Sequence, residues 1–474
     1  MVFNSVVFIF FAAVFFAFWP LARIRQNSRW LYIVSLSLFF YGWWNWRFIF
    51  LLVATAFVDF LAGLALERFD KHRRLILICS LGSNLAVLGF FKYYNFFADN
   101  LNSAATAAGA TWRLTPLAVI LPVGISFYTF QSMSYTIDIY RRQLHPTRNF
   151  FHFLAAVSLF PHLVAGPIMR AGKLLPQLVP KPVASDAERW EGLKLIVFGY
   201  FKKMVIADNL APAVNDAFAG QLPYHFTLSW WIVVTMFAFQ IYYDFSGYTD
   251  IARGLAKWMG YDFSLNFDHP YTANSLGEFW TRWHITLTSW FRDYVFFPVA
   301  RNRSGPTPRW RLYYAMTVVL LLSGLWHGAA WTFVAWGACH ALFLGVERLT
   351  GWPEKIKRLP FGIFFAWIIT LAQLWIAWVF FRATSMGQAF HVLGAMFSFG
   401  SATITVSGTA MFFLGIGVFR EVSRWVEINW VKIDWRNRLS PRLLRPAEMF
   451  ILSLMIVGSV YLRGPAGTFI YFQF

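Results

Sequence analysis

Apolar segments long enough to cross a membrane recur along the whole chain, and they restrict its fold more than any other feature. A helix needs roughly 20 mostly apolar residues to cross a hydrocarbon core of about 30 Å. Candidate segments lie at 6–21, 30–44, 48–66, 75–91, 117–137, 151–168, 193–206, 228–245, 316–344, 361–381, 410–418 and 449–461. The segment at 316–344 is long enough for a bent or double element. We expect an all-α integral membrane protein with about 10–12 transmembrane helices plus re-entrant or interfacial helices.

The composition supports this class. Of 474 residues, 58% are hydrophobic and 13% are charged, against roughly 45–50% apolar and 25% charged in soluble domains. No internal repeat or low-complexity linker divides the chain, so we expect residues 1–474 to form a single polytopic domain. The apolar N-terminal stretch lacks a basic region before it and a small-residue cleavage site after it, which predicts that it is retained. Cys79 and Cys339 lie in apolar runs and predict neither a disulfide nor a metal site.

The net charge of +19 comes largely from short loops between the apolar segments, not from a basic face for nucleic acid. Basic residues follow alternate segments: Arg23, Arg25 and Arg29, then Arg68, Lys71, Arg73 and Arg74, then Arg141 and Arg142. The positive-inside rule places these loops in the cytoplasm and the N-terminus outside it. It leaves 98–111 as an outer loop, and 169–189 and 432–445 as interfacial loops. Anionic lipid explains most of these charges, although an arginine cluster also attracts a phosphate-bearing acyl donor.

His327 is the most unusual single residue, because residues 314–344 contain no Lys, Arg, Asp or Glu. An ionisable group at membrane depth is by default a candidate functional residue. The alternative is a neutral imidazole that bonds to a neighbouring helix and simply holds two spans together. We assign that structural role to His340, which has no motif around it.

A second unusual segment, 278–294, mixes charged residues with many aromatic ones. As one helix it would present a mostly aromatic face at 279, 283, 286, 290 and 294, with Arg282, His284 and Arg292 elsewhere. It is too charged to cross lipid freely and too aromatic for an ordinary loop. We expect it to lie at the membrane interface or to dip into the protein.

Two further polar clusters interrupt the apolar pattern. Asp244 lies near the end of an apolar segment and must be paired or hydrated, and we expect an ion pair with Arg282, Arg292 or Arg253. Residues 160–167 contain two prolines, which predicts broken helix at membrane depth, tolerated only where protein or a water-filled cavity surrounds it.

Together these motifs resemble the membrane-bound O-acyltransferase (MBOAT) family, and within it the bacterial branch of the alginate O-acetylation type. The resemblance runs along nearly the whole chain and rests on six motifs: GISFYTFQSMSYTIDIY (124–140), FPHLVAGPI (160–168), FKKMVIADNL (201–210), YDFSGYTD (243–250), EFWTRWHITLTSWFRDY (278–294) and SGLWHGAAWTF (323–333). It implies many tilted helices around a central funnel. His327 and His284 match the two family histidines, whereas Ala330 and the segment 299–303 depart from the family pattern.

The resemblance and the chemistry together assign roles to these residues. Acyl transfer to a hydroxyl needs a base, an electrophilic thioester and donors for the developing oxyanion. We expect His327 to be the general base, since an apolar site favours a neutral imidazole. We expect His284 to position or polarise the donor, with Trp326, Asn274, Ser275 and Arg282 as weaker candidates for donor binding.

The resemblance also implies the reactants and the location. It implies cytoplasmic acetyl-CoA as donor substrate, no tightly bound cofactor or metal, a multi-pass protein of the bacterial inner membrane and an extracytoplasmic polysaccharide acceptor. The expected partner is a periplasmic SGNH-hydrolase-like acetyltransferase. Alternatives remain open: alginate, cellulose or peptidoglycan as acceptor, a D-alanyl carrier protein as donor, or, in a different class, a proton-coupled transporter.

The C-terminal residues 468–474 are apolar and aromatic, with one hydroxyl on Tyr471 apart from Thr468. The preceding segment starts from the basic loop 432–445, so the end should emerge outside the cytoplasm. We expect it to fold back into an apolar cavity, where it serves as a plug or a docking segment. A sharper hypothesis makes Tyr471 a covalent relay that His327 activates and that passes the acetyl group to the partner.

Overall fold

The computed structural model describes residues 1–302, 305–398, 400–401, 403–431, 441–467 and 469–472. The described residues form helices and connecting segments, with no strand among them. The chain divides into two compact units, one of residues Met1–Ile196 and Ile251–Ser264, the other of Val197–Asp250 and Leu265–Phe474. Neither unit is a continuous stretch of chain, because the chain passes between them within α10 (Asp186–Tyr200) and α12 (Thr227–Met259). The single-domain prediction is not tested by this division.

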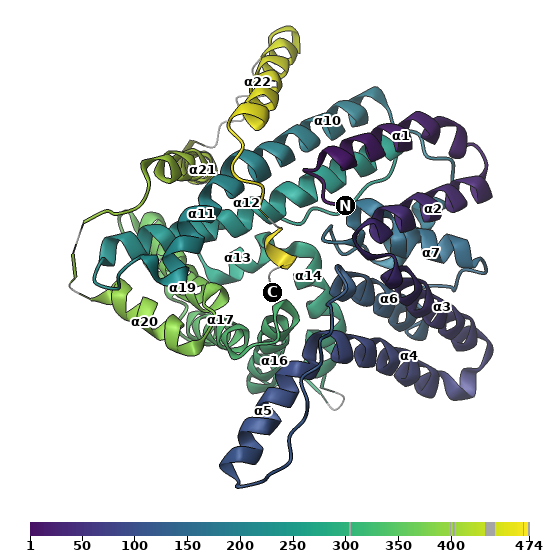
Figure 1. Ribbon diagram of the computed structural model, residues 1–474, viewed down its shortest axis with the longest axis horizontal. Coiled ribbons are helices and arrows are strands. Elements are labelled where there is room, and N and C mark those ends of the chain that lie inside the picture. The colour runs from purple at the N-terminus through teal and green to yellow at the C-terminus, as the bar shows by residue number, and fades with distance from the viewer. Residues whose placement is uncertain (303–304, 399, 402, 432–440, 468, 473–474) are drawn as a thin grey trace. The chain divides into compact units, whose positions relative to one another are not determined.

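The first unit contains mostly long helices. They are α1 (Val6–Ala22), α2 (Gln26–Asn45), α3 (Arg47–Arg68), α4 (Arg73–Leu88), α5 (Tyr94–Ala107), α6 (Ile125–Tyr140) and α7 (Phe150–Ser158), followed by the short α8 (Phe160–Leu163) and α9 (Ala171–Leu174). Three short 3-10 or π-helical segments join them: η1 (Asp70–His72), η2 (Gly89–Tyr93) and η3 (Leu175–Leu178). Helices α3, α4, α6 and α7 pack side by side (Figure 1).

Three helical stretches in the described chain are long and apolar enough to cross a membrane: Arg47–Arg68, Asp70–Ala107 and Gly362–Arg382. The apolar α1 is shorter. These helices agree with the predicted all-α membrane class, whereas the number of crossings and the funnel stay predictions.

Two predicted boundaries in the first unit are wrong. The expected outer loop 98–111 is helical as far as Ala107, because α5 continues the helical stretch that begins at Asp70. The segment expected to span from residue 117 becomes helical only at Ile125. Before it, the chain is extended and is held along α5 by side-chain amides: Asn95 pairs with both backbone groups of Leu117 (2.9 Å each), and Asn102 pairs with those of Leu114 (2.7 and 2.8 Å).

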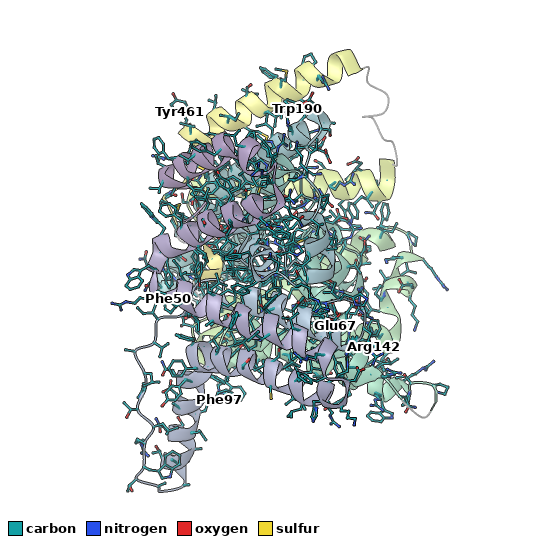
Figure 2. All side chains as sticks on the ribbon, turned by 90° about the vertical axis from the view of Figure 1, so that its right-hand side faces the viewer. Phe50, Glu67, Phe97, Arg142, Trp190 and Tyr461 are labelled. Carbon is teal, nitrogen blue, oxygen red and sulfur yellow. The ribbon has the colours of Figure 1, made fainter. Side chains whose placement is uncertain are left out.

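Two basic loops that the charge pattern puts on the same side do lie together. The guanidinium of Arg73 donates to the carbonyls of Ile139 and Tyr140 at the end of α6, at 2.8 and 2.9 Å. Arg142 pairs with Asp70 at 3.1 Å. Figure 2 shows Arg142 and Glu67 at the same end of this unit, with Phe50 toward the other end of α3. The predicted break at 160–167 is also present, since Leu159 separates α7 from the four-residue α8.

The second unit holds the remaining helices. They are η4 (Phe201–Ala207), α11 (Asp208–Asp216), η5 (Ala217–Gln221), η6 (Pro270–Thr272), α13 (Leu276–Arg282), α14 (Ile285–Phe291), η7 (Arg292–Phe296), α15 (Phe297–Ala300), α16 (Arg309–His327), α17 (Trp331–Thr350), α18 (Trp352–Lys357), α19 (Gly362–Arg382), α20 (Met386–Phe397), α21 (Gly408–Val426), η8 (Glu427–Val431), α22 (Pro441–Tyr461) and η10 (Ile470–Phe472). The 316–344 segment is thus two helices, α16 and α17, which pack side by side (Figure 1). Most of the interfacial loop predicted at 432–445 lies outside the described residues.

Candidate active site

His327 is the last residue of α16, at the sharp turn into α17. The two helices approach closely because glycines face backbone: a Cβ on Gly324 would lie 2.2 Å from the Phe333 carbonyl oxygen, and one on Gly337 would lie 2.4 Å from that of Leu320. Small residues allow such close helix packing in membranes. The hairpin therefore fixes His327 at its tip, where the side chain is 4% exposed.

His284 lies where the 278–294 segment is broken, so the prediction of one helix with a continuous aromatic face is wrong. Helix α13 ends at Arg282, and α14 begins at Ile285. Between them His284 adopts φ 41°, in the left-handed region that non-glycine residues rarely occupy. Strained backbone of this kind persists only where surrounding structure enforces it, and it concentrates at functional sites.

Asn266 fixes the orientation and the tautomer of His284. Its Oδ1 accepts from the Thr286 backbone N–H (3.3 Å) and hydroxyl (3.0 Å), so it is an acceptor, and His284 Nδ1 at 3.0 Å must be the donor. A neutral His284 then has its lone pair on Nε2. The backbone pair between Ile285 N–H and the Asn266 carbonyl (2.9 Å) holds the same two segments together. Asn266 and His284 are 0% and 1% exposed.

The structure brings together four of the predicted site residues. The Trp326 ring lies 5.0 Å from that of His327 and 6.0 Å from that of His284. The Tyr471 ring lies 5.6 Å from His327 and 6.4 Å from His284. All four belong to the same unit, although they come from the end of α16, the α13–α14 break and the end of the described chain. Aromatic side chains line the cluster: Phe245, Trp336 and Phe381.

The C-terminal segment folds back into this cluster. Phe469 and Ile470 are 3% and 2% exposed, and Tyr471 packs against Phe245 with ring centroids 4.4 Å apart. The ring of Tyr471 is partly exposed, but its hydroxyl oxygen is buried and has no hydrogen-bond partner among the described residues. A buried hydroxyl without a hydrogen-bond partner is costly, so this one is unusual. Thr468, Gln473 and Phe474 lie outside the described residues.

The other three predicted donor-binding residues have different neighbours. Asn274 accepts from Trp425 Nε1 at 2.9 Å and donates to Asn429 at 3.2 Å. Ser275 caps α13 by accepting from the Glu278 N–H, and Arg282 forms an ion pair with Glu278 at 2.7 Å. These contacts shape the start of α13, and donor binding by these residues stays a prediction.

The prediction that Asp244 pairs with an arginine is wrong, because its partner is a lysine. Lys203 lies between two carboxylates, with its Nζ 2.7 Å from Asp244 Oδ1 and 2.8 Å from Asp208 Oδ1. Arg282 pairs with Glu278, and Arg292 pairs with Asp293 at 2.8 Å. Lys203 and Asp208 stand at a helical stretch whose sequence looked like a weak span, so their spacing gave no signal of the pairing.

A pocket of about 380 Å³ lies between the α13–η7 segment and the α16–α17 hairpin. Arg292 and Arg348 line it, together with apolar side chains and the hydroxyl residues Thr288 and Ser289. Two other lining residues adjoin the histidines in sequence: Ile285 follows His284, and Ser323 lies one helical turn before His327. The pocket thus combines positive charge with residues next to both histidines.

Comparison with known proteins agrees with this arrangement. Residues 140–389 match the model of MBOAT, the membrane-bound O-acyltransferase family. The chain belongs to this family. It is therefore a membrane O-acyltransferase, and the matched range includes both His284 and His327, whereas Tyr471 lies outside it.

Several MBOAT relatives align along most of the chain. The probable alginate O-acetylase AlgI of Pseudomonas putida is 36% identical, and the alignment covers 100% of both chains. The peptidoglycan O-acetyltransferase of Helicobacter pylori is 34% identical over 84% of this chain and 80% of its own. The teichoic acid D-alanyltransferase of Streptococcus thermophilus is 26% identical over 50% of this chain and 59% of its own.

Proposed function

We propose that this MBOAT protein takes an acetyl group from cytoplasmic acetyl-CoA and passes it, through Tyr471, toward O-acetylation of an extracytoplasmic polysaccharide. The main supporting observation is that Tyr471 carries a buried hydroxyl on a ring that lies 5.6 Å from the ring of His327 and 6.4 Å from that of His284. A hydroxyl next to a neutral imidazole in an apolar site is the arrangement that nucleophilic catalysis requires.

The transfer has two steps. A ring nitrogen of His327 takes the proton of the Tyr471 hydroxyl as its oxygen attacks the thioester carbonyl. The C–S bond then breaks, the thiolate takes up a proton, and an acetyl-tyrosine ester and coenzyme A result. In the second step the hydroxyl of an acceptor, on the partner transferase or on the sugar, attacks the ester and releases Tyr471 with its proton. His284 polarises or positions the thioester in the first step.

The arginine-lined pocket is the proposed donor site. Arg292 and Arg348 suit the phosphates of coenzyme A, since guanidinium groups bind phosphate with paired hydrogen bonds. The apolar walls of the pocket suit the pantetheine arm. Ile285 and Ser323 also line the pocket, and in the sequence they lie next to His284 and one helical turn before His327. Within the same unit, Arg301, Arg309 and Arg311 follow the pocket-lining Phe297 in the sequence, and by the positive-inside rule these arginines support a cytoplasmic location for the pocket.

The names of the relatives favour acetyl over D-alanyl as the transferred group. Relatives that align over 84% or more of the chain are named for O-acetylation of alginate or of peptidoglycan. Two relatives named for D-alanyl transfer align over 50% and 61% of this chain, at 26% and 25% identity. We therefore propose an alginate-like polysaccharide as final acceptor, a periplasmic SGNH-hydrolase-like transferase as partner, and the inner membrane as location with the N-terminus outside the cytoplasm.

The proposal is tested with purified protein in proteoliposomes. Acetyl-CoA carrying a labelled acetyl group should transfer label to the protein, whereas a D-alanyl carrier protein under matched conditions should not. Label on the protein from the D-alanyl carrier protein, with none from acetyl-CoA, would contradict acetyl-CoA as the donor and support the D-alanyl carrier protein. Proton or solute uptake without any transfer from either donor would contradict the enzyme and support the transporter.

A further inference from the structure

We propose that Lys203, Asp208 and Asp244 form a buried charged clamp that holds the C-terminal tail, residues 462–467 and 469–472, so that Tyr471 stays against the two histidines. These three side chains are positioning residues, and the inference rests on the proposed function of Tyr471. They are 7%, 4% and 2% exposed, which makes them the most deeply buried ion cluster near the site.

The clamp binds the tail directly. The backbone N–H of Ile470 donates to Asp244 Oδ2 at 2.7 Å, one residue before Tyr471. The other oxygen of the same carboxylate pairs with Lys203 at 2.7 Å. Hydrogen bonds to a charged acceptor are among the strongest in proteins, and more so in a dry site. Asp244 therefore fixes the position of the backbone that leads into Tyr471.

A second anchor holds the start of the tail on the same elements. The Gly464 N–H donates to the Met204 carbonyl at 2.9 Å, and Asn209 Nδ2 donates to the Leu462 carbonyl at 2.8 Å. A Cβ on Gly464 would lie 2.4 Å from the Asp208 carbonyl carbon, so the backbones touch there. Both anchors lie on η4, α11 and α12, which the Lys203 ammonium links by bridging Asp208 and Asp244.

The charge of the cluster explains why it requires a hydrogen-bond donor from the tail. One ammonium faces two carboxylates, so the buried set has an excess negative charge when all three groups are ionised. The Ile470 N–H supplies a donor to the carboxylate oxygen that Lys203 does not reach. Without the tail, that oxygen would be buried and short of a donor, which is costly. Docking of the tail and satisfaction of the clamp are thus one event.

The test measures how accessible the tail is to a reagent. A Phe472→Cys reporter in a Cys79→Ser/Cys339→Ala background reacts with a membrane-impermeant maleimide added outside. Ile470→Pro removes the N–H that donates to Asp244 and leaves the three charges in place. Ile470→Ala is its matched control, because it also loses the buried isoleucine side chain but retains the N–H. Proline is tolerated at this first position of a 3-10 turn.

We expect Ile470→Pro to label at least about tenfold faster than Ile470→Ala, the factor typical of one hydrogen bond to a charged group. Asp244→Asn should also speed labelling of the reporter, compared with the control Asp250→Asn. The control removes a charge from the Lys202–Asp250 ion pair (2.6 Å), which joins the same two helices. Equal labelling of Ile470→Pro and Ile470→Ala would overturn the clamp. If Ile470→Pro does not fold, equal labelling of Asp244→Asn and Asp250→Asn would do so.

Labelling also separates the clamp from the relay. His327→Ala and Tyr471→Phe should lose acetyl transfer with unchanged labelling of the reporter, because the tail remains docked. Clamp variants should lower kcat and leave KM for acetyl-CoA unchanged, since the donor pocket is intact. A rise in KM at constant kcat in Ile470→Pro would contradict a positioning role.

Discussion

The ring of Tyr471 lies 5.6 Å from the ring of His327, although one belongs to the end of the chain and the other to the tip of the α16–α17 hairpin. This relationship brings a hydroxyl-bearing ring next to the imidazole of His327 in an MBOAT protein. The account predicts how substitutions around the pair act.

Replacement of His327 should abolish transfer without loss of the folded protein. We expect His327→Phe to lower the rate by about 10²–10⁴-fold, the usual contribution of a general base. His340→Phe is the matched control, because His340 is buried on the same hairpin and also packs against Trp336, whereas its other ring neighbours are Phe279 and Trp280. Transfer rates of the two variants at equal membrane levels check this, and a tenth of the wild-type rate in His327→Phe would remove it as the base.

Replacement of Asn266 should alter the ring position and the tautomer of His284 while the His284 side chain itself is unchanged. Asn266→Ala leaves the buried Thr286 N–H and His284 Nδ1 without their acceptor, which should cost about 1–3 kcal/mol of stability. The variant should also approach the low activity of His284→Ala, since the tautomer and the ring position are no longer fixed. A thermal melt and a transfer assay measure the two effects. Full activity with lowered stability would show that Asn266 is only structural.

The close contact between α16 and α17 should depend on glycine. We expect Gly337→Val to destabilise the protein by about 1–3 kcal/mol, because its side chain would meet the Leu320 backbone. Gly345→Val is on the same helix and has nothing within 4 Å of its Cβ. Unfolding temperatures in detergent compare the two, and equal temperatures would contradict the packing described for the hairpin.

Donor affinity should depend on the arginines of the pocket. Arg348→Gln should raise KM for acetyl-CoA several-fold with little change in kcat, since it removes one phosphate contact far from the reacting atoms. Lys355→Gln is a control outside the pocket on the neighbouring α18. Identical KM values of the two variants for acetyl-CoA would contradict a donor site in this pocket.

Local sequence patterns predicted the helical membrane class and singled out His327, because a histidine within an uncharged apolar run is conspicuous. They also indicated that residues 316–344 were long enough for a bent or double element. The motifs of the family pointed to His284. The break at His284 was not predictable, since residues 279–294 fit a helical pattern. The strained backbone is held by bonds from the preceding segment, at Asn266 and Asp268, which a helical pattern does not reveal.

The sequence also did not predict the partners of the buried polar groups. Asp244 was expected to pair with Arg282, Arg292 or Arg253, because a carboxylate at membrane depth must be paired or hydrated. The lysine that pairs with it lies about forty residues earlier, in the apolar segment predicted at 193–206. Contacts of this kind depend on how helices pack, which apolar periodicity does not specify. Tyr471 was a candidate because an aromatic tail is costly to expose and because a tyrosine hydroxyl can form a covalent intermediate when a base activates it.

The most direct test of the account is the chemical state of Tyr471 during turnover. Purified wild-type protein is given acetyl-CoA without an acceptor, quenched in acid and digested, and the C-terminal peptide is examined by mass spectrometry. The account predicts an acetyl group on Tyr471 that is absent from His327→Ala and disappears when the acceptor is added. Unmodified Tyr471 in wild type, together with full polysaccharide acetylation by Tyr471→Phe, would contradict it.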